Sequence, residues 1–198
     1  MKLYYSDASP YARCVRVFIR YHHISDVEEI LTDPFDNSPE LLRANPLAKV
    51  PCLLLNDGLA LFDSDVIMRY LDSEFGQSSL LGAVADNWAQ QCHLSLLKGI
   101  IDSAVSLRQE QCREDALRST FWMSRYEQAL LRGLKEVETL GMINTQELTA
   151  AQVMLICLLE YIDFRHPDLP WRKLTPALSV WLSGVQKAEP FMATRPAT

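Results

Sequence analysis

The chain has 198 residues, of which 48% are hydrophobic and 22% are charged, a balance typical of folded globular proteins. This composition excludes an intrinsically disordered chain, which would have too little apolar surface to bury. The formal net charge is −6, from 19 Lys and Arg against 25 Asp and Glu. A nucleic-acid partner is therefore not expected, because binding to phosphates needs a basic surface.

Several features indicate a cytoplasmic protein without a membrane segment. The N-terminus reads MKLYYSDAS, where polar residues interrupt the apolar run that a secretory signal needs. No apolar run approaches the ~20 residues that span a bilayer. The five cysteines contain no CxxC pair, which is typical of reduced structural thiols, and the histidines lack the spacing of metal ligands. We therefore expect neither a disulfide framework nor a metal.

Up to Gly76, short apolar runs typical of strands alternate with segments of helical periodicity. The expected elements are a strand at 2–5, a helix at 10–22, a strand at 27–31, a helix at 38–44, strands at 50–55 and 59–62, and a helix from 63 onward. The last two strands flank Asn56-Asp57-Gly58, which is a strong hairpin signal. The order βαβαββα predicts an α/β domain at residues 1–76 with a mixed four-stranded sheet.

The composition changes after Gly76, and residues 77–84 are predicted to form a linker. Beyond it, residues 85–198 predict an all-helical domain. Apolar or small side chains recur every fourth residue from Trp88 to Ala104, the pattern of a long amphipathic helix. The run VMLICLL at 153–159 is apolar on all sides, so its helix is expected at the centre of this domain.

Ser9-Pro10 has two explanations. Serine before proline is a common helix start, with Ser as N-cap and Pro in the first turn. The same geometry allows a hydroxyl at the positive end of a helix to donate to an anion. Lowering a thiol pKa from ~8.5 to ~6.5 requires about 2.7 kcal/mol, and a charge-assisted hydrogen bond supplies ~1.5–3 kcal/mol. The dipeptide alone leaves both explanations open.

Two further motifs also allow a structural and a functional interpretation. Val50-Pro51 alone would be a trans bond that opens a strand, whereas a cis bond would turn the Val50 backbone toward a peptide-like ligand. Asp63 or Ser64 is expected to cap the next helix. Alternatively, Ser64 and backbone N–H groups bind a carboxylate while Asp63 pairs with an ammonium. That combination would recognise the head group of an α-amino acid.

Taken together, the order and spacing of these motifs resemble the N-terminal domain of cytosolic glutathione transferases, and the resemblance covers essentially the whole chain. NPLAKVP and LFDSDVIMRYLD are similar to motifs of that family. The resemblance implies a thioredoxin-like domain followed by an all-helical domain. It also implies a cytoplasmic homodimer in detoxification that binds glutathione as co-substrate and transfers it to a small electrophile. Isomerisation or dehalogenation is equally compatible, and the alternative is a non-catalytic regulatory or protein-binding member of the fold.

The resemblance also implies roles for individual residues. Ser9 is expected to be the catalytic residue that contacts the glutathione sulfur. Val50, before a cis Pro51, is expected to pair with the cysteinyl backbone. Asp63 and Ser64 are expected to bind the γ-glutamyl head group, although the family often has Glu in place of Asp63, so affinity is expected to differ.

Other residues have weaker assignments. Lys49 is a candidate for the glycyl carboxylate, and a solvated loop charge explains it equally well. The electrophile pocket is expected between the domains, with Tyr11 and Arg108 as candidates for its lining; residues that merely pack are the alternative for both. The family's Ser/Thr-x-x-Asp helix cap reads Thr149-Ala-Ala-Gln152 here, which still allows a capping box.

Overall fold

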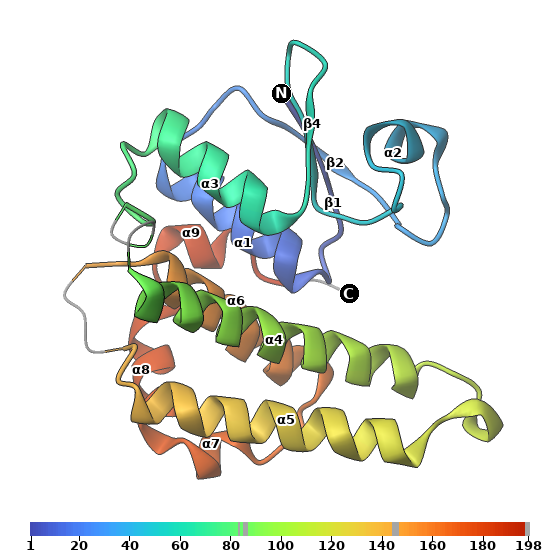
Figure 1. Ribbon diagram of the computed structural model, residues 1–198, viewed down its shortest axis with the longest axis vertical. Helices are drawn as coiled ribbons and strands as arrows, with labels where there is room; N and C mark the ends of the chain where they lie inside the picture. The colour runs from blue at the N-terminus through green and yellow to red at the C-terminus, as the bar shows by residue number, and fades with distance from the viewer. Residues whose placement is uncertain (83, 85–86, 144–146, 197–198) are drawn as a thin grey trace. The chain divides into compact units, whose positions relative to one another are not determined.

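A computed structural model describes residues 1–82, 84, 87–143 and 147–196 of the chain, which divides into two compact units (Figure 1). The first unit contains residues 1–82 and the described residues of the C-terminal segment from Ala188, and the second lies between them. No helix in the described part of the chain has both the length and the apolar character needed to cross a bilayer.

The first unit is built on a four-stranded sheet of order β2-β1-β3-β4. Its elements are β1 (Lys2–Tyr5), α1 (Pro10–Tyr21), β2 (Glu28–Leu31), α2 (Pro39–Ala44), β3 (Cys52–Leu54), β4 (Ala60–Leu61), α3 (Ser64–Phe75) and, from the C-terminal segment, α9 (Glu189–Met192). β1 is parallel to β2 and antiparallel to β3, which is antiparallel to β4. The predicted mixed sheet and βαβαββα order are confirmed.

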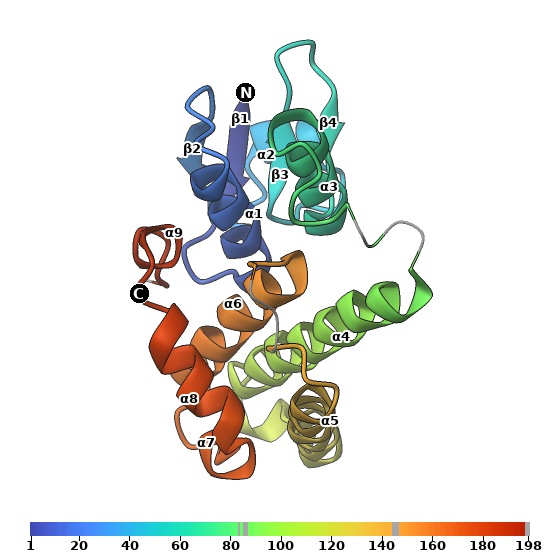
Figure 2. The same cartoon turned by 90° about the vertical axis from the view of Figure 1, so that its left-hand side faces the viewer.

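Alternation along β1 explains how helices cover both faces of this sheet. Tyr4 is buried in one cluster with Leu41 of α2 and Cys52 of β3, whereas the buried Leu3 must point to the opposite face, because successive strand residues alternate. On that face α1 and α3 pack against each other. In Figure 2, α1 and α3 lie in front of the sheet and α2 lies behind it.

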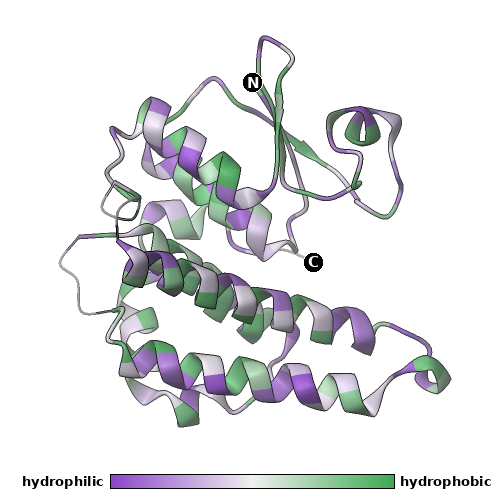
Figure 3. Cartoon of the chain, in the orientation of Figure 1, coloured by the Kyte–Doolittle hydropathy of each residue, from purple (hydrophilic) through white to green (hydrophobic). Residues whose placement is uncertain are grey.

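The regular elements in the described residues of the second unit are all helices, as predicted. It contains α4 (Trp88–Gln111), the 3-10 turn η1 (Asp115–Leu117), α5 (Thr120–Thr139), α6 (Ala150–Arg165), α7 (Trp171–Leu174) and α8 (Pro176–Val185). α4 packs against both α5 and α6. The unbroken run of buried residues from Gln152 to Ile162 confirms α6 as a central helix. Figure 3 shows the contrast, with α6 largely green while α4 and α5 carry hydrophobic and hydrophilic faces.

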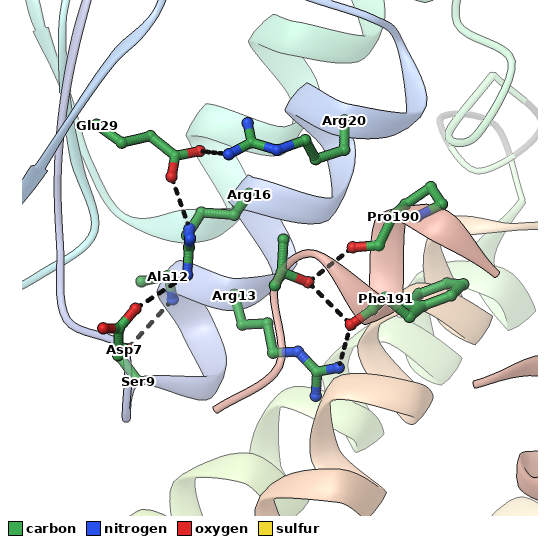
Figure 4. Close-up of polar contacts among 10 residues, drawn as sticks. Asp7, Ser9, Ala12, Arg13, Arg16, Arg20, Glu29, Pro190 and Phe191 are labelled. Atoms are coloured by element: carbon green, nitrogen blue, oxygen red, sulfur yellow. Dashed lines mark hydrogen bonds and ion pairs between the residues drawn. The ribbon is translucent and has the colours of Figure 1, made fainter. Parts of the chain in front are cut away.

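The C-terminal segment differs from the sequence interpretation, which placed residues 188–196 in the helical domain. In the structure α9 packs on α1 of the first unit. Phe191 is 2% exposed, and its carbonyl oxygen accepts a hydrogen bond of 3.2 Å from Arg13 Nη2 (Figure 4). The burial of one aromatic side chain thus ties the segment to the first unit.

Part of the predicted linker is folded onto α3. The buried Asp72 carboxylate accepts hydrogen bonds from the backbone N–H groups of Leu80, at 3.1 Å, and Leu81, at 2.8 Å. Residue 83 of the predicted linker, and residues 85–86 just beyond it, lie outside the described residues.

Candidate functional site

The strand register brings the three sequence motifs to one edge of the sheet. Tyr4 pairs with Cys52, and Leu53 pairs with Leu61, in antiparallel ladders. The end of β1, the start of β3 and the end of β4 therefore lie side by side. The segments that meet at this edge are the loop that carries Ser9, the Val50–Pro51 step and the Phe62–Asp63 step.

Ser9 is the N-cap of α1. Its backbone is extended, with φ −83° and ψ 117°, and its Oγ accepts a hydrogen bond of 3.2 Å from the Ala12 N–H (Figure 4). The Ser9 N–H donates to the Ser6 carbonyl at 3.0 Å, which fixes the loop as a turn. A hydroxyl both accepts and donates, so capping leaves the hydroxyl proton available to an anion. Ser9 can therefore cap the helix and stabilise a negative charge at its positive end.

The Val50–Pro51 step is presented by a loop that Asn45 organises. Asn45 is 2% exposed; its Nδ2 donates to the Lys49 carbonyl at 2.9 Å, and its Oδ1 accepts from the Leu47 N–H at 3.0 Å. The Val50–Pro51 peptide bond is cis. Within the described residues the N–H and C=O of Val50 make no hydrogen bond. An extended peptide-like ligand can pair with both groups.

Sequence reasoning missed the role of Asn45, although the signal was present. Asn before a proline, as in Asn45-Pro46, is typical of a turn in which the Asn side chain binds the backbone two residues further on. The motif NPLAKVP contains that dipeptide. Asn45 therefore positions Val50 without any expected contact to a ligand.

Asp63 and Ser64 have separate roles at the start of α3. Asp63 is the N-cap, and its Oδ1 accepts from the Asp65 N–H at 3.2 Å. Ser64, 4% exposed, is the first residue of the helix, and its hydroxyl makes no hydrogen bond within the described residues. The N–H groups of a first helical turn have no partner inside the helix. Together with the Ser64 hydroxyl, they can bind a carboxylate.

The remaining candidates lie in different places. Lys49 is exposed and precedes the Val50–Pro51 step, and Tyr11 is half-buried in the first turn of α1. Arg108 belongs to the second unit, half-buried near the end of α4, where its charge acts on Tyr161 and His166. The structure thus gathers all the candidates except Arg108 in the first unit.

Thiols of the chain itself do not supply a nucleophile at this edge. Cys52 follows Pro51 and is fully buried, and burial raises the pKa of its thiol to about 11, so it stays protonated near neutral pH. Cys14 on α1 is also buried. The described residues contain no group of three or more His, Cys, Asp or Glu side chains that could hold a metal ion. An anionic sulfur at this edge would therefore come from a ligand.

A network of charges behind Ser9 also escaped sequence reasoning. Arg16 of α1 lies with its Nη1 3.1 Å from Asp7 Oδ1 and its Nε 3.0 Å from Glu29 Oε2, and Arg20 also binds Glu29, at 2.7 Å (Figure 4). The Arg16 guanidinium also lies over the Tyr5 ring, 4.3 Å from its centroid. Because Glu29 lies on β2 whereas Arg16 and Arg20 lie on α1, no local sequence pattern indicates this network.

A thioredoxin-like α/β unit joined to a helical unit, with the three motifs at one edge of the sheet, defines the class of fold. Residues 3–79 match the N-terminal domain of glutathione S-transferases, and residues 120–183 match the C-terminal domain. The chain therefore belongs to the glutathione transferase family, as the sequence motifs indicated.

Relatives match along the whole chain. A family member from Pseudomonas fluorescens Pf-5, solved with bound glutathione, is 30% identical, with a TM-score of 0.88 over 100% of this chain and 99% of that one. Another structure of a family member from that organism, with bound S-(propanoic acid)-glutathione, is 30% identical, with a TM-score of 0.84 over 100% of both chains. The uncharacterized GST-like protein YibF of Escherichia coli K12 is 26% identical over 200 residues, covering 99% of this chain and 98% of that one.

Proposed function

We propose that this chain is a glutathione transferase that binds glutathione, stabilises its thiolate and transfers it to a small electrophile. The observation that carries the proposal is the hydrogen bonding of Ser9: Oγ accepts from Ala12 while its proton remains available at the start of α1. The bound glutathione in a similar structure, and the glutathione thioether in another, support this choice of ligand. The proposal includes a cytoplasmic homodimer in detoxification, as the resemblance implies.

The three parts of glutathione fit the three groups at the sheet edge. The Val50 N–H and C=O would pair with the cysteinyl backbone, next to Pro51. The Ser64 hydroxyl and the first turn of α3 would hold the γ-glutamyl carboxylate, and the Asp63 carboxylate would pair with the ammonium. Lys49 would approach the glycyl carboxylate. This assignment gives every charged group of the tripeptide a partner of opposite charge or a set of donors.

The chemistry then requires little of the chain beyond stabilising a charge. The glutathione thiol loses its proton to solvent, and the Ser9 hydroxyl donates to the resulting thiolate. The sulfur lone pair forms a C–S bond with the electrophilic carbon, and the leaving group departs with its bonding pair. Tyr11 and Arg108 remain the proposed lining residues of the electrophile pocket.

The first test is calorimetric titration with glutathione, followed by ultraviolet detection of the bound thiolate across pH. In Ser9→Ala the bound thiol pKa is expected to rise by about 1–2 units, because ~1.5–3 kcal/mol of charge-assisted hydrogen bonding is lost. Affinity should change little, and turnover with a model electrophile should fall accordingly.

The matched control is Ser119→Ala. Ser119 is the N-cap of α5 and accepts from the Trp122 N–H at 3.3 Å, so this variant loses a similar cap away from the site. It should leave the thiol pKa unchanged. No glutathione binding by the wild-type chain would refute the proposed function and favour the non-catalytic alternative. Binding with identical pH profiles in wild type and Ser9→Ala would refute the role of Ser9 alone.

A further inference from the structure

The loop that carries Ser9 is held by a buried arginine. The Arg16 side chain is 10% exposed, and its two ion pairs join the loop residue Asp7 to Glu29 of β2. Its guanidinium also covers the ring of Tyr5, the last residue of β1. One side chain of α1 thus contacts the strand before the loop, the loop itself and the neighbouring strand, as Figure 4 shows for the two carboxylates.

The position of Asp7 gives this contact an electrostatic consequence. Asp7 precedes Ser9 by two residues in the same turn, and its carboxylate is only 32% exposed. An uncompensated carboxylate here would oppose a second negative charge at the start of α1, because a nearby like charge disfavours ionisation. Arg16 places a positive charge 3.1 Å from that carboxylate, and opposite charges at this distance offset one another.

We propose that Arg16 is a positioning residue for Ser9: by pairing with Asp7 it fixes the turn and neutralises the charge beside the place where a thiolate binds. This inference rests on the proposed function, because it concerns a thiolate held by Ser9. Arg16 acts through Asp7 and Ser9 and needs no contact with the ligand.

The competing explanation is that Arg16 serves only to fasten β2 to α1. Arg20 supplies the matched control, because its Nη2 binds the same Glu29 carboxylate at 2.7 Å. Within the described residues, Asp7 forms its ion pair with Arg16. Arg20→Gln therefore weakens the ion pairing between α1 and β2 and keeps the ion pair of Arg16 with Asp7.

The experiment measures the pKa of bound glutathione from thiolate absorbance in five proteins: wild type, R16Q, R20Q, D7N and D7N/R16Q. R16Q should raise the thiol pKa by about one unit, because Asp7 is then uncompensated, and R20Q should leave it unchanged. D7N should lower it, since the negative charge of Asp7 is then removed from the turn and Arg16 keeps only its ion pair with Glu29. The double variant, with neither charge, should return close to wild type.

Circular dichroism checks that each variant is folded, and D7N carries the test in the opposite direction if R16Q fails to fold. If wild type binds the thiolate and the bound thiol has the same pKa in wild type and in the folded R16Q and D7N proteins, this inference is overturned and the proposed function is not. An equal rise in R16Q and R20Q, or no return in the double variant, would overturn it in favour of simple fastening. No glutathione binding in wild type would overturn the proposed function and this inference together.

Discussion

Ser64 is available to bind a ligand because its neighbour, Asp63, caps α3. Asp63 caps α3, so the buried Ser64 hydroxyl is not needed to start the helix. Ser64 is only 4% exposed, and its hydroxyl makes no hydrogen bond within the described part of the chain. A ligand carboxylate would satisfy it. The division of labour between two adjacent residues therefore supports their assignment to the amino-acid end of glutathione.

Ser64→Ala should weaken glutathione binding by roughly 10- to 100-fold, since a hydrogen bond to a carboxylate is worth ~1.5–3 kcal/mol. Calorimetric titration measures the affinity, and thermal unfolding should show little change because Asp63 still caps the helix. Ser73→Ala, at an exposed position on the same helix, is the control and should bind normally. Unchanged affinity in Ser64→Ala would place the carboxylate site elsewhere.

At the scale of elements, the start of α6 shows what an amide side chain at position 152 contributes that a carboxylate could not. Thr149 Oγ1 accepts from the Gln152 N–H at 3.2 Å, and Gln152 Oε1 accepts from the Thr149 N–H at 3.3 Å, which confirms the capping box. Gln152 Nε2 also donates to the Met142 carbonyl at 3.4 Å. A carboxylate could accept in the capping box and could not donate to Met142.

Gln152→Glu is therefore expected to lower the free energy of unfolding by about 1–3 kcal/mol. At this position, which is only 4% exposed, a carboxylate oxygen would replace Nε2 and face the Met142 carbonyl oxygen. Urea unfolding followed by circular dichroism measures the change. Thr149→Ser keeps the cap hydroxyl and should remain within about 0.5 kcal/mol of wild type. Equal stability of Gln152→Glu and wild type would show that the Met142 contact contributes nothing.

Elements were predictable from sequence where their signals are local. The hairpin follows from Asn56-Asp57-Gly58, and α6 follows from its continuous apolar run. The pairing of Arg16 with Glu29 was not predictable, because it depends on the parallel register of β1 and β2. The Ser9, Pro51 and Ser64 motifs were found from the residues, and the family resemblance implied their roles; their meeting at one sheet edge required the strand register.

On the scale of the whole chain, the assignment of the C-terminal segment shows where sequence reasoning stops. Residues 188–196 follow an all-helical stretch and carry no composition change that would return them to the α/β unit. Their position is decided by Phe191, which is buried in that unit, where its carbonyl accepts from Arg13. Such a long-range contact depends on which surface is left uncovered by other elements, and a local pattern cannot report it.

Each unit contains one largely buried histidine whose titration links stability to pH. His22, with its side chain 5% exposed and Nε2 3.1 Å from Asp72, has a pKa lowered by burial, which outweighs the attraction of Asp72. His166 has its Nε2 2.9 Å from the Ala104 carbonyl oxygen. Burial lowers the pKa of His166, and the charges of Arg108 and Arg165 lower it to a smaller extent. The hydrogen bond to Ala104 and the Glu127 charge raise this pKa but do not outweigh burial. Both histidines are therefore expected to bind protons more readily in the unfolded chain.

The sign of the pH dependence follows from this difference. Between the lowered folded pKa and the unfolded value of ~6.5, the unfolded chain binds more protons, so stability increases with pH. The stabilisation is present above about pH 6.5 and is lost as pH falls toward the folded values, by at most ~1.4 kcal/mol per pH unit for each histidine. Urea unfolding at pH 5.5–7.5 measures the slope, which should be reduced in His22→Gln and reduced further in the double variant His22→Gln/His166→Gln. A slope that is absent or negative in wild type, or unchanged in the double variant, would contradict this account, because the two histidines would then not bind protons more readily in the unfolded chain.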